Sequence, residues 1–481
     1  MNSGPALIAI DLGAASCRVS LLRWQGERPC IEIVRRFSNA PEDHGPAGLR
    51  WNLDRICREI EAALHSCAQL APDGIAAIGV TGWAVDYVRL DALGHPLAPP
   101  FCYRDPRNAA AAQAVHAIVP AGTLYAMTGV QIQPINTVYQ LFADDPATFS
   151  APWVNLPEYI LHSLGAPRVA EYTNSTHTAL IDAETRQWSE EIFSALHLDR
   201  AAAPEIVAPG TVLGPVRPDL RALPAFAHTQ LIAPACHDTA SALVGMGDSP
   251  GCWAYISSGT WSLVGTLLSA AVRTPEAGAR GFTNLGAADG RVLFHRGITG
   301  MWPLQQCMEF WNTQHAPNLP AWYLEDLIAA ARHVPEPDAL LDLDDPALAQ
   351  PGDMPARINA QRTQRGLPPL PERSDAAPQM ASLIFHSLAA RYAELISEIA
   401  RLTGRSPERI RIAGGGSRND YLNALTARAA QIPVERCSVE SATLGNLALQ
   451  WTSLDASSAP AASARESLAR KIAILSTAEI V

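Results

Sequence analysis

A two-domain α/β fold is predicted for this chain from its length, its alternation of strand and helix patterns, and a repeated hairpin. The chain has 481 residues, and a single core stops growing at roughly 250–300 residues, so two domains are expected. Apolar runs of strand length alternate with helical periodicities along the chain, which is typical of α/β proteins. We predict the boundary at GMGDSPG, giving domains 1–246 and 247–481.

The first element is an apolar strand, ALIAID, followed by a turn of small residues and a second strand, RVSLLRW. Asp11 and Gly13 lie at this turn. The same shape returns in CWAYIS, SGT and WSLVGTLL, with Gly259 in the turn. Two apolar runs around a glycine turn predict a hairpin, and the repeat indicates that a hairpin opens each domain.

The elements between the hairpins alternate in type. Apolar spacing predicts a helix over 53–70 and a buried strand over 75–83. It also predicts a strand–turn–strand over 85–97 and a strand–turn–helix over 228–247.

The second domain continues in the same way. Residues 335–378 are rich in proline and acidic side chains, which predicts a surface excursion with short helices at most. An amphipathic helix follows over 382–404, with Gly404 as its C-terminal cap. A strand, a triple-glycine turn and a helix are predicted over 410–431, and a strand, loop and helix over 434–451.

Composition limits the partners and the compartment. The formal net charge is −11 and no basic stripe occurs, which argues against a nucleic-acid partner. The nine cysteines include no CxxC pair, so we expect free thiols in a reducing compartment. The N-terminus has no basic, apolar leader pattern and no run reaches membrane length, so the expectation is a cytoplasmic protein without a membrane partner.

Lys471 is the only lysine, and it lies in LARKIAIL without a preceding glycine loop. A Walker A loop requires Gly-Lys-Ser/Thr, and a protein kinase requires a lysine on its third strand. Any handling of ATP must therefore use another architecture.

Three motifs could carry chemistry, and each also has an ordinary structural explanation. Asp11 ends a buried strand before a glycine turn; it could hold Mg²⁺ near phosphates or simply form the turn. The glycines 414–416 between a strand and a helix suit a nucleotide phosphate, or a strained turn. Asp238 opens a small-residue helix, either as a general base or as a helix cap, and His237 precedes it.

Two loops, TGWAVD and CYRDPR, gather aromatic and polar side chains. Such loops suit a sugar, because rings stack on tryptophan and hydroxyls take hydrogen bonds. Two surface turns with a salt bridge would give the same pattern.

The order of the motifs is more specific than any one of them. The series IDLGAASCR, GWAVDY, CYRDPR, QPINTVYQL, EYTNSTHT, CHDTASAL, SSGTWSL, GMWPLQQ, AGGGSRN and ESATLGN resembles the FGGY carbohydrate kinases, and among them the rhamnulokinase branch. The resemblance runs from Leu7 to about Trp451. It implies a two-domain actin- and hexokinase-like (ribonuclease H-like) fold with an interdomain cleft, and phosphorylation by ATP and Mg²⁺ of a small sugar, at the 1-hydroxyl of a ketose such as L-rhamnulose.

The resemblance also implies roles for particular residues. Asp238 matches the catalytic base, and Asp11 lies near Mg²⁺. The sugar positions are Trp83, Ala84, Asp86, Arg104, His237 and Thr239. The ATP positions are Asp11, Gly13, Ala14, Ala15, Ser16, Cys17, Arg18, Gly259, Thr260, Gln305, Gly414, Gly415, Gly416 and Asn419.

The sequence departs from the rhamnulokinase pattern at two sugar positions. Thr81-Gly82-Trp83-Ala84 stands where that branch has Asp-Thr-Trp-Gly, and Gly297 stands where it has Asn. Losing a residue that reads a hydroxyl changes sugar discrimination, so the sequence predicts the reaction type and leaves the sugar open. An actin-like ATPase, or a sugar-responsive regulator without turnover, is the alternative; a homodimer is a further possibility.

Overall fold

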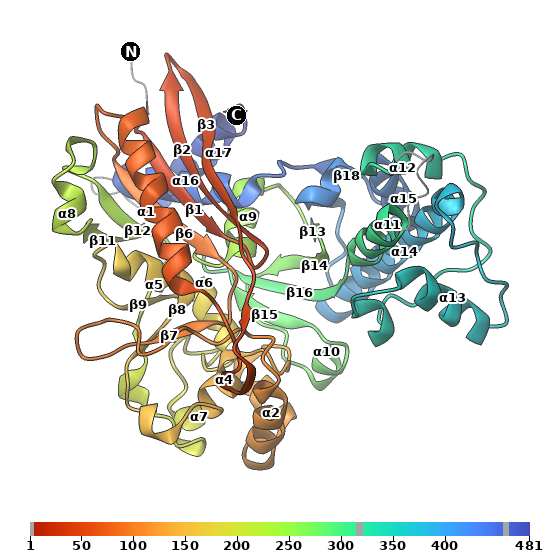
Figure 1. Ribbon diagram of the computed structural model, residues 1–481, viewed down its shortest axis with the longest axis horizontal. Coiled ribbons are helices and arrows are strands. Elements are labelled where there is room, and N and C mark those ends of the chain that lie inside the picture. The colour runs from red at the N-terminus through yellow and green to blue at the C-terminus, as the bar shows by residue number, and fades with distance from the viewer. Residues whose placement is uncertain (1–3, 314–320, 456–460) are drawn as a thin grey trace. The chain divides into compact units, whose positions relative to one another are not determined.

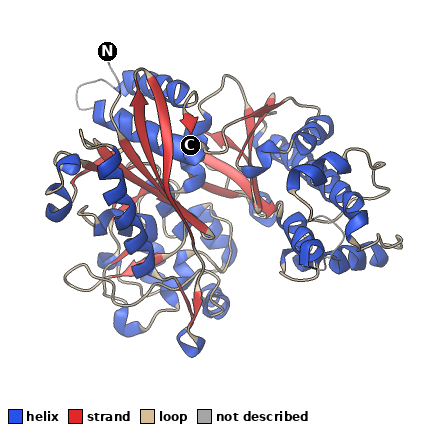
Figure 2. Cartoon of the chain, turned by 45° about the horizontal axis from the view of Figure 1, so that its top comes forward, coloured by secondary structure: helices blue, strands red, loops and turns tan. Residues whose placement is uncertain are grey.

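The computed structural model describes residues 4–313, 321–455 and 461–481. They form two compact units. The first unit comprises 1–248, 268–293 and 440–481, and the second comprises 249–267 and 294–439. In each unit, helices surround a group of strands (Figure 2). Among the helices that the structure describes, none combines the length and the apolar character that a membrane span needs.

The first unit is built on a seven-stranded sheet of order β11-β12-β6-β1-β2-β3-β19. The strands are β1 (Leu7–Leu12), β2 (Ser16–Gln25), β3 (Arg28–Ser38), β6 (Ala77–Gly82), β11 (Thr211–Pro215), β12 (Gln230–Ala233) and β19 (Glu479–Ile480). β1, β2 and β3 form an antiparallel meander, as the first predicted hairpin requires. β1, β6 and β12 are parallel.

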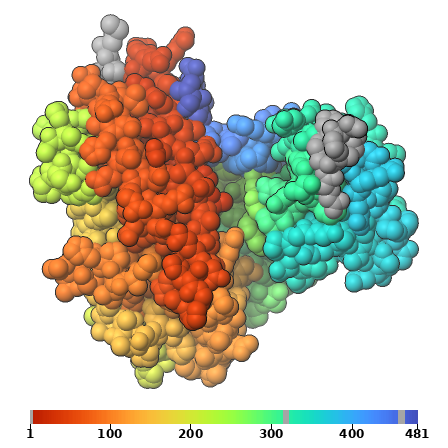
Figure 3. Space-filling view, in the orientation of Figure 1, coloured from red at the N-terminus to blue at the C-terminus, as the bar shows by residue number. Residues whose placement is uncertain are grey.

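Helices cover both faces of this sheet, because β1 is apolar on both sides. Ile8 and Ile10 pack with α1 (Leu53–Leu70) and α5 (Leu156–Ser163) in one core cluster. Leu7 and Ala9 pack with α16 (Ser441–Asp455) and α17 (Ala461–Leu475) in another. Figure 1 shows α1 and α16 on opposite sides of the sheet, and the N-terminal part of the chain, red to orange, forms much of the face that this unit presents in Figure 3.

The remaining elements of the first unit are short. They are β4 (Glu42–Asp43), β5 (Leu49–Arg50), β7 (Tyr87–Arg89), β8 (Trp153–Asn155), β9 (Val169–Glu171), β10 (Glu205–Val207), β15 (Thr283–Gly286), α2 (Arg107–Ile118), α3 (Ala121–Thr128), α4 (Thr137–Phe142), α6 (Tyr172–Ser175), α7 (Glu190–Ala195), α8 (Pro218–Arg221), α9 (Asp238–Met246) and α10 (Pro275–Ala279).

The second unit places its strands in the order β16-β14-β13-β17-β18. They are β13 (Trp253–Ser258), β14 (Trp261–Leu268), β16 (Val292–Thr299), β17 (Arg409–Ala413) and β18 (Val434–Arg436). β13 and β14 form the second predicted hairpin, and β13, β17 and β18 are parallel. The helices are α11 (Trp302–Thr313), α12 (Leu324–Ala331), α13 (Met354–Gln364), α14 (Ala377–Thr403) and α15 (Asp420–Ala430).

Three sequence expectations differ from the structure in detail. The predicted division into 1–246 and 247–481 differs for 268–293 and 440–481, which belong to the first unit because, for example, α16 buries its apolar face against that unit's sheet. The strand–turn–strand expected over 85–97 is reduced to β7 and a single bridge, since β7 pairs with β8 instead.

The long amphipathic helix begins earlier than the predicted residue 382. α14 starts at Ala377, with a proline in its first turn, a position where the missing N–H costs nothing. Its predicted cap is confirmed, since Gly404 is left-handed with φ of 66°. All nine cysteines, each within the described residues, are free thiols as expected.

Candidate active site

The main candidate residues of the first unit gather where three parallel strands end. Asp11, on β1, pairs in register with Thr81 on β6. The next residue of β6, Gly82, forms a parallel bridge with His237, and its N–H donates to the Cys236 carbonyl over 2.8 Å. Parallel strands present their carboxyl ends at one edge of a sheet, which is where α/β proteins bind ligands. The fold thus brings together motifs that are far apart in the sequence.

Asp238 is the first residue of α9. About half of its side-chain surface, 47%, is open to solvent, and its Oδ1 lies 3.3 Å from His237 Nε2. Although the side chain is half exposed, the protein packed around the carboxyl removes part of its hydration and raises the pKa of Asp238 to about 6; hydrogen bonds from Thr239 oppose the rise and the nearby charge of Asp11 adds to it. A reachable carboxylate whose pKa lies near neutrality has the properties of a general base.

α9 is held rigidly against α16 by two glycines. A Cβ at Gly245 would lie 1.9 Å from the Ser441 carbonyl oxygen, and a Cβ at Gly445 would lie 1.9 Å from the Ser241 carbonyl oxygen. The Ser241 hydroxyl also donates to the Ala442 carbonyl over 2.8 Å. Since only glycine allows this approach of the two backbones, the helix that carries Asp238 has a fixed position in its unit.

Asp11 is nearly buried and is surrounded by donors. The hydroxyls of Thr81 and Thr443 donate to its Oδ1 and Oδ2 respectively, and Arg18 Nε donates to Oδ2 over 2.9 Å. Arg18 also forms an ion pair with Glu440. Both oxygens of Asp11 are therefore occupied by protein donors, so a hydrated cation would meet this carboxylate through its water shell rather than displace three partners.

The turn after Asp11 exposes backbone and small side chains. Ala15 and Ser16 are exposed, while Gly13 and Ala14 are partly buried. Cys17 is buried, and burial raises the pKa of its thiol to about 12. The Gly13 carbonyl accepts from Asn39 Nδ2 over 3.1 Å. Of the residues predicted here for ATP, Ala15 and Ser16 offer the most open surface.

The first predicted sugar loop is organised around the fully buried carboxylate of Asp86. Its Oδ2 accepts from the indoles of Trp51 and Trp83, over 2.6 and 2.9 Å, and its Oδ1 accepts from Gln140 Nε2 over 3.1 Å. Burial raises the pKa of Asp86 to about 6, while these hydrogen bonds lower it. Asp86 thus holds the two indoles in place. Val85 beside it has a φ of 74°, a strained value for a β-branched residue and one found at functional loops.

Ala84 is buried, with 8% of its surface exposed. Thr239, also nearly buried, donates from its hydroxyl to Asp238 Oδ1 over 3.1 Å. Ala84 therefore has little open surface, and Thr239 acts on the carboxylate beside it.

The second predicted sugar loop is fixed by its own aspartate. Asp105 Oδ2 accepts from the Leu49 N–H over 2.6 Å, and Oδ1 accepts from the Arg107 N–H over 2.9 Å. The exposed Arg104 guanidinium lies 5.3 Å from the centre of the Tyr103 ring. Arg104 therefore presents its positive charge to solvent, where a ligand can reach it.

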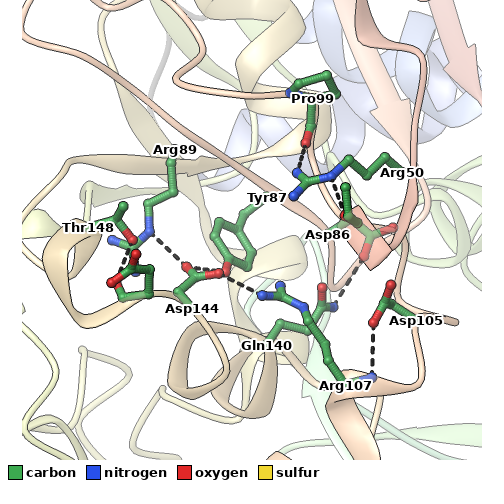
Figure 4. A network of polar contacts seen from close by, with 12 residues as sticks. Arg50, Asp86, Tyr87, Arg89, Pro99, Asp105, Arg107, Gln140, Asp144 and Thr148 are labelled. Carbon is green, nitrogen blue, oxygen red and sulfur yellow. Dashed lines mark hydrogen bonds and ion pairs between the residues drawn. The ribbon is translucent and has the colours of Figure 1, made fainter. Parts of the chain in front are cut away.

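A cavity of about 300 Å³ lies beside this loop. Figure 4 shows the contacts along its wall, where Asp144 accepts from Tyr87, Arg89 and Arg107 over 2.6, 2.9 and 2.9 Å. The Arg107 guanidinium stacks 3.4 Å from the centre of the Phe101 ring. None of the residues predicted to contact the sugar lines this cavity, so it is separate from the candidate base.

In the second unit, the hairpin tip contacts the start of α11. The exposed Thr260 hydroxyl donates to Gln305 Oε1 over 3.1 Å. The Gly259 carbonyl accepts from the Met301 N–H over 2.9 Å, and the Thr260 carbonyl accepts from the Gly300 N–H over 3.0 Å. The structure thus brings together three of the residues predicted for ATP.

The triple-glycine turn lies against the same hairpin. Gly414 has a φ of 82°, and a Cβ there would lie 2.5 Å from the Ser258 carbonyl oxygen. A Cβ at Gly416 would lie 2.0 Å from Ser258 Oγ, whereas Gly415 has nothing within 4 Å. Asn419 caps α15 through its Oδ1, and its buried Nδ2 has no hydrogen-bond partner among the described residues. A backbone turn with an open glycine and an orphaned amide fits a nucleotide.

Four residues that shape these sites had no role predicted from the sequence. They are Trp51, Gln140, Glu440 and Thr443. Three of them, Gln140, Glu440 and Thr443, occur within motifs of the series. Trp51 carried no motif signal, because its contact with Asp86 joins residues 35 positions apart.

Comparisons with known proteins identify the family. Residues 6–245 match the N-terminal domain, and residues 254–454 the C-terminal domain, of the FGGY family of carbohydrate kinases. A rhamnulokinase of Enterococcus faecalis is 34% identical over 92% of this chain and 88% of its own length. A rhamnulokinase of Bacteroides thetaiotaomicron is 32% identical over 92% of this chain and 89% of its own length.

Solved structures show the same fold. A ligand-bound xylulose kinase of Lactobacillus acidophilus superposes with a TM-score of 0.77 at 16% identity, covering 98% of this chain and 96% of that one. A glycerol kinase of Plasmodium falciparum with ADP gives 0.76 at 13% identity, covering 98% and 93%. The fold is therefore the actin-like two-domain α/β kinase fold, as predicted. By fold and by sequence, this chain belongs to the FGGY family of carbohydrate kinases.

Proposed function

We propose that this chain transfers the γ-phosphoryl group of ATP to the 1-hydroxyl of a ketose, namely L-rhamnulose or a related deoxyketose or ketopentose. The observation that carries the proposal is Asp238, a solvent-reachable carboxylate at the start of α9 with a pKa raised to about 6. The rhamnulokinases that share about a third of the sequence support the choice of sugar class. A pure binder, such as a regulator without turnover, has no use for such a base.

In the proposed reaction, Asp238 accepts the proton of the sugar hydroxyl while that oxygen attacks the γ-phosphorus. The bond from the γ-phosphorus to the bridging oxygen breaks, and ADP leaves with the electron pair. The products are a sugar phosphate, ADP and one proton, which returns to solvent from Asp238. A base whose pKa is close to the working pH combines a high ionised fraction with useful proton affinity.

The sugar would lie beside this base. His237 is adjacent in the chain, and the bridge from Gly82 to His237 brings the Trp83 loop next to it. We propose that His237, Thr239 and the exposed Arg104 offer polar contacts, and that Trp83, which is only 7% exposed, offers the small open part of its ring. Ala84 would limit the space, while Asp86 acts by fixing the Trp83 indole.

The residues proposed to contact ATP lie in and around glycine turns, and are given for each unit by itself. In the second unit the proposed contacts are Gly259, Thr260, Gln305, Gly414–Gly416 and Asn419, and in the first they are Gly13–Arg18. In phosphoryl transfer from ATP, Mg²⁺ neutralises the charge of the phosphates. We propose that the Asp11 carboxylate would hold this ion through bridging water molecules.

Coupled ADP release with Mg-ATP against a sugar panel tests the proposal. L-Rhamnulose, L-fuculose, L-ribulose, L-xylulose and D-xylulose form the panel, with the matching alditols as controls. We expect one ketose to be used at least tenfold better than the others. ATP consumption that no sugar stimulates would instead support the ATPase alternative, and ATP binding without turnover would support the regulator.

A further inference from the structure

Two histidines meet next to the candidate base. His177 lies in the short 3₁₀ turn Thr176–Thr178, and His237 is the residue before α9. His177 Nε2 and His237 Nδ1 are 3.1 Å apart, a hydrogen-bond distance. The ring centres are 4.0 Å apart at an angle of 60°. The second ring nitrogen of His237, Nε2, lies 3.3 Å from Asp238 Oδ1. The two imidazoles and the carboxylate therefore form a line of polar groups.

The backbone around both histidines is fixed by the buried carboxylate of Glu171. Its Oε2 accepts from the Cys236 N–H over 2.8 Å and from the Thr173 hydroxyl over 2.5 Å. The same Thr173 oxygen accepts from the His237 N–H over 3.4 Å. On the other side, the His177 carbonyl accepts from Asn136 Nδ2 over 3.3 Å. The contact between the imidazoles thus joins two anchored segments of the first unit.

The contacts on the two ring nitrogens of His237 favour the same positions of the protons. An ionised carboxylate has only lone pairs to offer, so a lone pair on His237 Nε2 would repel it, whereas an N–H there is attracted. In neutral His237 the proton then resides on Nε2, and Nδ1 becomes an acceptor. His177 must supply the matching donor from its Nε2, because a hydrogen bond between two ring nitrogens needs one proton.

We propose that His177 is a positioning residue: its hydrogen bond to Nδ1 is needed, beside the attraction of Asp238 for an N–H on Nε2, to hold His237 in the tautomer that presents an N–H beside Asp238. That N–H donates a hydrogen bond to an oxygen of the sugar. The oxygen is bonded to the carbon adjacent to the one that carries the phosphorylated hydroxyl. The inference rests on the proposed function and deepens it, since it names the chemistry selected: a hydroxyl that donates to Asp238 next to an oxygen that accepts from His237. A 2-ketose phosphorylated at O1 has this arrangement.

The tautomer itself is tested without any substrate. The protein, with its 13 histidines, is labelled with ¹⁵N-histidine, and two-bond ¹⁵N–¹H spectra are recorded above pH 7. The His237→Gln variant identifies the His237 signals by their loss. We expect His237 with its proton on Nε2 in the wild type, a shift toward the Nδ1–H form in His177→Leu, and the wild-type form in His177→Gln. Glutamine is the control because its amide can donate from nearly the position of His177 Nε2.

Kinetics then test the reading of the sugar. With the ketose that the wild type uses, His177→Leu should lower kcat/KM for the sugar about 10- to 100-fold, leaving the KM for ATP unchanged. His177→Gln should restore most of the loss. An unchanged His237 tautomer in His177→Leu would overturn the proposal, as would equal losses in the leucine and glutamine variants. If the wild type phosphorylates no sugar, the proposed function fails, while the spectra still decide the role of His177.

Discussion

The two units share one strand order and differ in where the chain adds its insertions. The order β3-β2-β1-β6-β12 of the first unit corresponds to β16-β14-β13-β17-β18 of the second. In the first unit, residues 83–229 separate β6 from β12, whereas residues 414–433 suffice between β17 and β18. The second unit instead inserts residues 300–408 before β17. β6 and β17 hold the same place in the two strand orders. The long insertion follows β6 in the first unit and precedes β17 in the second.

The chemistry at the strand ends differs as well. The first unit places the carboxylates of Asp11 and Asp238 there, and the second places Ser258 and the Gly414–Gly416 turn. A carboxylate can accept a proton, and a glycine turn lets backbone N–H groups approach an anion. The comparison fits the proposal that proton transfer belongs to the first unit and phosphate contacts mainly to the second, and each prediction below tests one side of that proposed division.

The largest effect is expected from Asp238→Asn. The amide keeps the size of the side chain but cannot accept a proton, so kcat should fall by about 10²- to 10⁴-fold while ATP still binds. Coupled ADP release and an ATP titration measure the two quantities. Asp54→Asn is the matched control, because Asp54 also lies in the first turn of a helix of this unit but is exposed. Equal, small losses in both variants would overturn the assignment of Asp238 as the base.

The pH profile sharpens the same assignment. If Asp238 is the base, it must be ionised to act, and its pKa is raised to about 6, so kcat/KM should fall about tenfold per pH unit as the pH drops below 6. Above pH 7, kcat/KM should no longer depend on the ionisation of Asp238, since the carboxylate is already ionised. The residual activity of Asp238→Asn should not show this fall in kcat/KM at acid pH. If the same fall persists in the variant, another group titrates.

The sequence predicted the architecture because local signals and the fold agree. Helix α1 occupies 53–70 as predicted, since its apolar spacing coincides with a capping side chain, Asn52. The same agreement placed both hairpins and Gly404. Where a distant partner decides, the sequence predicted only part of the structure: the turn after β7 forms and keeps the bridge between Leu90 and Pro96, but the ladder of β7 is made with the distant β8.

The candidate site shows the same limit. Asp11 and Asp238 stand at a strand–turn and a strand–helix junction, but these junctions also fit an ordinary turn and a helix cap, so it was the order of the motifs and the family resemblance that gave the two residues their predicted roles. That Thr443 donates to Asp11 could not be read locally, because 432 positions separate the two residues. The burial of Asp86 was likewise hidden, since it depends on Trp51 and Gln140 from other segments.

Asp11→Ala should have the second largest effect. It leaves the hydroxyls of Thr81 and Thr443 and one side of Arg18 without their acceptor in a nearly buried site. Unpaired buried donors cost about 1–3 kcal/mol each, with partial relief by water, so we expect a loss of about 2–3 kcal/mol in the free energy of unfolding. Urea denaturation measures it, with the exposed Asp73→Ala as control. A stability equal to the control would mean that Asp11 has no structural role in its unit.

The glycine turn of the second unit should respond position by position. Gly414→Ala meets both a left-handed φ of 82° and the Ser258 carbonyl oxygen at 2.5 Å, so it should lower the stability by about 1–2 kcal/mol. Gly415→Ala, which meets nothing within 4 Å, should leave the stability within about 0.5 kcal/mol. Thermal unfolding compares the two. If Gly415→Ala alone raises the KM for ATP, this position faces the nucleotide; equal destabilisation by both would contradict the geometry of the turn.

Thr260→Val should have the smallest effect, confined to the nucleotide. The Thr260 hydroxyl and Gln305 are both exposed, and their 3.1 Å hydrogen bond can be replaced by water, so the stability should change by less than about 0.5 kcal/mol. If the hairpin tip touches phosphate, the lost hydroxyl should raise the KM for ATP about three- to tenfold, as one exposed hydrogen bond is worth about 1 kcal/mol. The KM for the sugar should not change. Thr260→Ser keeps the hydroxyl and should behave like the wild type. A rise in the sugar KM instead would move this hairpin to the sugar side and break the division between the two units.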